Sequence, residues 1–140
     1  MKKHYYGLFA LLTLAGCATS IVHPDQADPV PADRLYAFTQ KTGSDDAKIT
    51  VVRDEGLYGS ACGLIVRIDG KRAAMLSTGE VASFHVTPGE HSLSAGLSGQ
   101  GMCSHLVDKS IELVAKPSQQ RTYRLSFDQG GFYINPYIAD

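Results

Sequence analysis

Three histidines in the second half of the chain are the first candidates for chemistry. His85 and His91 flank the turn Pro88-Gly89, so a hairpin could bring their imidazoles together on a metal ion. His105 follows later, and no third ligand has the spacing that a metal site needs. We interpret all three as strand or surface residues, and we expect no metal and no cofactor.

Nucleophilic catalysis is the second kind of chemistry to weigh. A triad can be drawn from Ser83, His105 and Asp108, but the chain lacks the Gly-x-Ser-x-Gly turn that exposes a serine nucleophile. The adjacent acids Asp54 and Glu55 would point to opposite sides of an extended chain, which favours a solvated turn over a paired acid and base. We therefore expect no catalytic residues and predict that the protein is not an enzyme.

The cysteines carry a more specific signal. Two lysines near the start precede an apolar stretch over residues 7–14 that is too short to span a bilayer. The run Leu14-Ala15-Gly16-Cys17 that closes it resembles the bacterial lipobox of lipoprotein signal peptides. The resemblance implies cleavage before Cys17 and lipidation of that residue with palmitate-type chains, and Ala18 in place of aspartate implies the outer membrane. The alternative is an uncleaved membrane anchor with an incidental cysteine.

Cleavage would divide the chain into a signal peptide over residues 1–16, a lipidated cysteine with a flexible linker over 17–33, and a domain over 34–140. The linker contains three prolines and few large apolar residues, so we expect an extended spacer. The mature chain would carry 11 lysines and arginines against 14 acidic residues, a formal charge of −3. This balance does not suit nucleic acid.

Cys62 and Cys103 then remain as an even pair. In an oxidising periplasm a disulfide bond is the expected state of such a pair. A metal or redox site would need another nearby thiol or a Cys-x-x-Cys spacing, and neither is present.

Apolar residues from Leu35 onward alternate with polar ones and are interrupted at short intervals by turn signals, of which Asp69-Gly70 is the strongest. The pattern predicts an all-β domain of two packed antiparallel sheets, a β-sandwich. The expected strands cover residues 35–39, 49–53, 64–68, 73–76, 82–86, 93–97, 111–115, 123–127 and 132–134.

Two turn motifs within this pattern resemble a known family. Ile68-Asp69-Gly70-Lys71 and Pro88-Gly89-Glu90-His91-Ser92-Leu93 are similar to the turns of PEGA-type modules and of related uncharacterised envelope lipoproteins. The resemblance implies an immunoglobulin-like or transthyretin-like sandwich with a non-catalytic role at the cell envelope. Cys62 and Cys103 depart from the PEGA pattern and favour the lipoprotein group.

Two surfaces are candidates for binding a partner. The first is the glycine-rich loop Gly96–Cys103, where Leu97, Gln100 and Met102 would form a flexible crest above the disulfide.

The second surface is the C-terminal strand, where Tyr133 and Tyr137 face away from the core. The alternative is that these tyrosines only cover an edge strand, and Pro136 supports an edge position.

The favoured function is a lipid-anchored protein on the periplasmic face of the outer membrane. Its non-catalytic sandwich would bind a protein partner or a cell-wall component, without nucleic acid or a small-molecule cofactor. The alternative is a periplasmic enzyme or inhibitor acting through the loop Gly96–Cys103.

Overall fold

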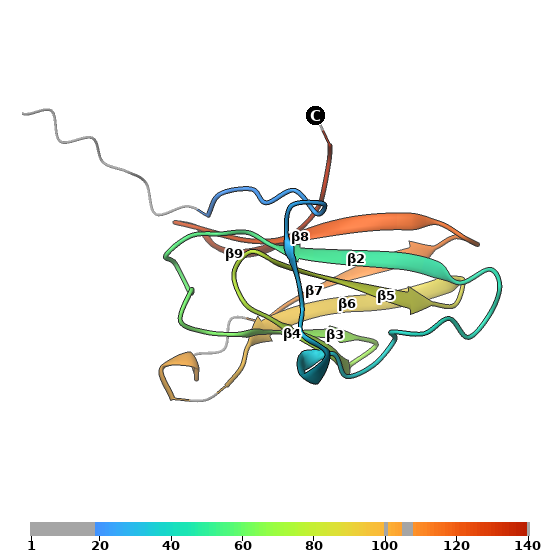
Figure 1. The fold of residues 1–140 in the computed structure, drawn as a ribbon, viewed down its shortest axis with the longest axis horizontal. Helices are drawn as coiled ribbons and strands as arrows, with labels where there is room; N and C mark the ends of the chain where they lie inside the picture. Colours follow the sequence, from blue (N-terminus) through green and yellow to red (C-terminus); the bar gives the residue numbers. More distant parts are fainter. Residues whose placement is uncertain (1–18, 100, 105–107, 140) are drawn as a thin grey trace, which may run out of the picture.

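The computed structural model describes residues 19–99, 101–104 and 108–139. Two β-sheets pack on each other over an apolar core, so the predicted sandwich is confirmed (Figure 1). One sheet has the strand order β1-β5-β2-β8-β9 and the other has the order β4-β3-β6-β7. The strands are β1 Asp28–Pro29, β2 Ala47–Arg53, β3 Leu64–Ile68, β4 Lys71–Leu76, β5 Glu80–Val86, β6 Gly89–Leu97, β7 Lys109–Ala115, β8 Gln120–Asp128 and β9 Gly131–Pro136.

Helical structure in the described residues is limited to two short 3₁₀ turns, η1 Ala32–Arg34 and η2 Gly101–Cys103. None of the described helices is long and apolar enough to cross a membrane.

The alternation of apolar and polar residues along the strands determines which side chains form the core. Leu64 and Leu93 of one sheet and Phe84, Tyr123 and Phe132 of the other are almost fully buried and belong to one apolar cluster. Side chains at alternate positions of a strand point to the same face, so each strand contributes every second residue to the space between the sheets.

Turn chemistry sets one of the hairpins. Asp69 and Gly70 both have positive φ, 50° and 76°, as the two-residue connection between the antiparallel strands β3 and β4 requires. The five-stranded sheet is mixed, because β2 pairs in parallel with β8 and β1 pairs in parallel with β5. The alternation predicts which face is buried and says nothing of this strand order.

The segment predicted as a free linker lies on the sandwich instead. The amides of Asp28 and Val30 donate hydrogen bonds of 3.0 Å to two carbonyl oxygens along the β5 edge. Pro29 has no N–H and falls between these two donors, where the pairing does not need one. Val30 is buried in the core. A segment too polar to form a core of its own is therefore ordered by a sheet edge that already exists.

The strand predicted over 35–39 is also absent. Leu35 forms only an isolated bridge with Ala74, and Phe38 adopts a left-handed φ of 63°. Leu35 and Phe38 both pack against the core. Residues three apart cannot share one face of a regular strand, so the backbone turns to bury both.

Candidate functional site

A disulfide joins two loops at one end of the sandwich. Cys62 ends the loop after β2, and Cys103 ends η2 after β6. The two residues are 41 positions apart in sequence, and their Cα atoms are 5.6 Å apart. The predicted Cys62–Cys103 bond is therefore confirmed. Figure 1 shows the two loops, green and orange, together at the left end of the molecule.

A buried guanidinium lies beneath this end. Arg53, at the end of β2, points inward and is 1% exposed. Its Nη atoms donate to the carbonyl oxygens of Gly59, Cys62 and Leu76 over 2.6 to 2.8 Å. Burial lowers the pKa of Arg53 to about 10, which leaves the group charged at neutral pH. One side chain thus fixes the loop, the half-cystine and the end of β4.

The next residue, Asp54, is fully buried on the other side of the strand end. Its carboxylate accepts hydrogen bonds from the guanidinium of Arg124 and from the backbone amide of Val22. Glu55 is exposed. The prediction that the two acids face apart is confirmed, whereas the predicted solvated turn is wrong for Asp54, because Arg124 on the adjacent strand β8 supplies a partner that the local sequence does not reveal.

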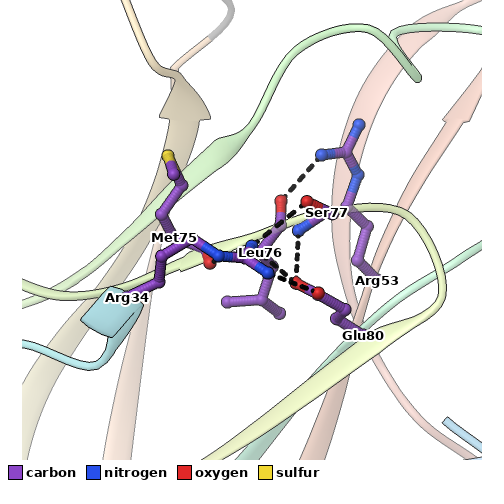
Figure 2. Close-up of polar contacts among 6 residues, drawn as sticks. All are labelled: Arg34, Arg53, Met75, Leu76, Ser77 and Glu80. Carbon is purple, nitrogen blue, oxygen red and sulfur yellow. Dashed lines mark hydrogen bonds and ion pairs between the residues drawn. The ribbon is translucent and has the colours of Figure 1, made fainter. Parts of the chain in front are cut away.

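A second ion pair holds the start of the domain (Figure 2). Arg34 of η1 donates to both carboxylate oxygens of Glu80 over 2.8 and 2.6 Å. Glu80 also accepts from the amide of Ser77 over 2.7 Å. Partial burial opposes ionisation of Glu80, but these donors outweigh it and lower the pKa of the carboxyl. The carboxylate is therefore fully used in fastening η1 to the turn between β4 and β5.

The predicted loop residues are placed differently from one another. Leu97 belongs to β6 and packs against the core, so it is no part of an exposed crest. Gln100 lies outside the described residues. Met102 is 86% exposed, and the Gly99 amide donates to the Cys103 carbonyl oxygen over 3.2 Å at the base of the turn. Of the three predicted residues, only Met102 is seen at the surface.

Tyr133 lies in the edge strand β9, as Pro136 predicts, and Tyr137 directly follows that strand. The Tyr137 hydroxyl is 2.5 Å from Nδ1 of His23, so this tyrosine holds the N-terminal segment. Tyr133 is partly buried and lines an open hollow of about 440 Å³ together with Arg124, Asp128 and Asn135 among others. Tyr137 therefore makes a contact within the fold, whereas Tyr133 borders open space at the surface.

The two described histidines that were considered as metal ligands lie in different sheets, His85 in β5 and His91 in β6. His91 lies 2.7 Å from the Asp69 carboxylate and 2.6 Å from the Thr87 carbonyl oxygen, which occupy both ring nitrogens. Partial burial opposes the charge of His91, but these two acceptors outweigh it and raise its pKa. Among the described residues, no three His, Cys, Asp or Glu side chains are placed to hold a metal ion. His105 lies outside them.

Sequence reasoning missed two exposed residues beside the disulfide. Leu57 and Tyr58 occupy the loop after β2 and are 94% and 53% exposed. Their signal was a pair of large apolar residues between Gly56 and Gly59, glycines that here both adopt positive φ. Side chains in the middle of a tight turn are exposed to solvent, because no neighbouring strand covers them.

No family model, no curated protein and no solved structure matches this chain.

Proposed function

We propose that the chain is a lipoprotein anchored through Cys17 on the periplasmic face of the outer membrane, with a non-catalytic sandwich that binds a protein or another component of the envelope. The observation that carries this proposal is the pairing of Cys62 with Cys103. Disulfides persist in oxidising compartments, and the run Leu14-Ala15-Gly16-Cys17 supplies a signal for export to one.

The use of the buried charges supports a binding role. Arg53, Asp54 and Glu80 each contact backbone groups or an opposite charge within the fold. A general acid or base must have its titratable atom within hydrogen-bond reach of a substrate. These three groups instead brace loops and chain segments of the fold.

The hollow beside Tyr133 is the binding surface that the geometry favours. An amphipathic aromatic ring stands next to the guanidinium of Arg124, the carboxylate of Asp128 and the amide of Asn135. Aromatic and arginine side chains are enriched at the centres of protein interfaces, and donors and acceptors at their rims fix orientation.

Two measurements test the anchor and the binding role separately. Labelled palmitate should enter the wild-type chain and should not enter the Cys17→Ser variant. Crosslinking in intact envelopes followed by purification should recover a stoichiometric partner, which Tyr133→Ala loses and Tyr36→Ala retains. Tyr36 is the matched control, because it is an exposed tyrosine of another part of the domain.

A wild-type chain without palmitate would contradict the anchor. Turnover that is abolished by changing a single histidine or acid would contradict the binding role and support a periplasmic enzyme instead.

A further inference from the structure

The described chain begins at the end of the sandwich that carries the disulfide. There its first two residues are hydrogen-bonded near the ends of β2 and β8. The Thr19 amide donates to the Phe127 carbonyl oxygen over 2.9 Å, and the Phe127 amide donates to the Thr19 hydroxyl over 3.0 Å. Ser20 and Glu55 exchange two backbone hydrogen bonds of 2.6 and 3.1 Å. The described chain is therefore hydrogen-bonded to the sandwich from Thr19 onward.

The proposed lipid attachment is two residues away. Consecutive Cα atoms are about 3.8 Å apart, so the two peptide units that join Cys17 to Thr19 can span at most about 7.6 Å. Acyl chains on Cys17 would hold Thr19 close to the lipid headgroups. The length of chain between anchor and domain thus decides which end of the sandwich meets the bilayer. This step rests on the lipidation proposed above.

The same end presents most of the exposed apolar side chains. Seven large apolar side chains are exposed in the described part of the chain, and four of them belong to segments at this end. These four are Ile21, Leu57, Tyr58 and Met102. In Figure 1 the start of the described chain in blue, the loop after β2 in green and η2 in orange all lie at the left. We call these four residues the apolar tip.

The charge around the apolar tip suits neutral lipid. Within residues 19–21, 55–62 and 101–104 the only charged side chain is Glu55, and Asp128 lies in the neighbouring β8–β9 hairpin. Anionic headgroups are recognised by clusters of lysine and arginine, which these segments lack. Apolar area is what such a surface offers to a membrane, and a tyrosine is suited to the interface between headgroups and acyl chains.

The apolar tip is also held in place before any contact is made. The disulfide ties the Met102 turn to the loop that carries Leu57 and Tyr58, and Arg53 holds the carbonyl oxygens of that loop. The backbone of such a braced loop loses little further conformational freedom when the loop inserts, which favours binding.

We propose that the apolar tip rests on the lipid bilayer, with Leu57 and Met102 inserted below the headgroups and Tyr58 at their level. The protein is then a monotopic module whose orientation is set by the anchor and the tip together. The hollow beside Tyr133, which Thr19 and Asp128 also line, would then lie next to the headgroups and stay open to a partner.

Photocrosslinking identifies the occupant of this surface. A diazirine amino acid replaces Leu57 in the full chain, and a matched chain carries it in place of Lys116. Lys116 is exposed and follows Ala115, which pairs with Gly89 at the end of β6 remote from the disulfide loop. Both lipidated chains are purified from membranes into vesicles of phosphatidylcholine alone, and into vesicles that also contain phosphatidylglycerol. Adducts are identified by mass spectrometry.

A phospholipid adduct at position 57 in both kinds of vesicle, and none at position 116, is the expected result. Met102→Asp should reduce the adduct at 57, whereas Val114→Asp, an exposed change on β7, should leave it unchanged. A chain that takes palmitate and floats with vesicles but forms no lipid adduct at 57 overturns this proposal alone. So does an adduct that needs phosphatidylglycerol, or a protein adduct at 57 in intact cells. A wild-type chain without palmitate overturns the anchor and this proposal together.

Discussion

Replacing Arg53 with methionine tests whether a single guanidinium holds the loop end of the sandwich together. The side chain is almost fully buried, and it donates to the carbonyl oxygens of Gly59, Cys62 and Leu76 over 2.6 to 2.8 Å. Methionine is also long and flexible, but it donates no hydrogen bond. All three carbonyl oxygens therefore lose a charged donor while the cavity stays largely filled.

The size of the effect follows from which of these bonds are buried. A buried carbonyl group left without its donor costs about 1–3 kcal/mol. The bonds to Cys62 and Leu76 are buried, whereas water can replace the partly buried one to Gly59. Removing a buried charge offsets part of the loss. We expect the free energy of unfolding to fall by about 3 kcal/mol, a large share of the 5–15 kcal/mol typical of a domain.

Urea unfolding of the oxidised protein, followed by circular dichroism, measures this difference. The matched control is Arg67→Met on β3, because Arg67 is only partly buried and should change stability by about 0.5 kcal/mol or less. Hydrogen exchange of amides in residues 55–62 should also accelerate in Arg53→Met. A loss below about 1 kcal/mol for Arg53→Met, or an equal loss for the control, would refute the reasoning.

Three further perturbations follow from the same contacts. Replacing both Cys62 and Cys103 with serine should lower the free energy of unfolding by about 4 kcal/mol for a separation of 41 residues, and treatment of the wild type with dithiothreitol should give a similar loss in urea unfolding. Glu80→Gln should cost about 2 kcal/mol at pH 7. The pKa of Glu80 is lowered in the fold. Its contribution to the free energy of unfolding is therefore present above its unfolded pKa of about 4.3 and is lost as the pH falls through the folded pKa. The free energy of unfolding should therefore change less between pH 6 and pH 3 in the variant than in the wild type. The pKa of His91 is raised beside Asp69. Its contribution to the free energy of unfolding is therefore complete below its unfolded pKa of about 6.5 and is lost as the pH rises through the pKa of the folded protein. His91→Gln should therefore remove a pH-dependent step of about 0.5 kcal/mol between pH 6 and 8, and an unchanged step would contradict this assignment.

Local patterns in the sequence predict the parts of the fold that depend on neighbours along the chain. Alternation places Phe84, Leu93 and Leu125 inside, and the turn Asp69-Gly70 sets a hairpin, because each signal is contained within a few residues. The Cys62–Cys103 bond is predicted by elimination, since only two cysteines remain once Cys17 is assigned to lipid.

Contacts between distant segments could not be predicted in this way. The parallel pairing of β2 with β8 leaves no trace in the alternation of either strand. Asp54 is buried because Arg124 lies opposite, 70 positions later. The segment around Pro29 looks like a linker by composition, and it is ordered only because the edge of β5 accepts two of its amides. In each case the partner lies outside any local window.

The docked N-terminal segment links the two proposals physically while leaving them separable by experiment. It covers the β5 edge, which would otherwise present unpaired backbone groups to other chains, and it would leave little slack between the domain and the proposed anchor. Thr19 also lines the hollow beside Tyr133, so a partner bound there would lie close to the headgroups. Changes at Met102 should alter contact with lipid without loss of the partner, and Tyr133→Ala should do the reverse. If one substitution abolished both, the tip and the hollow would be one surface, and the orientation inferred from the anchor would be wrong.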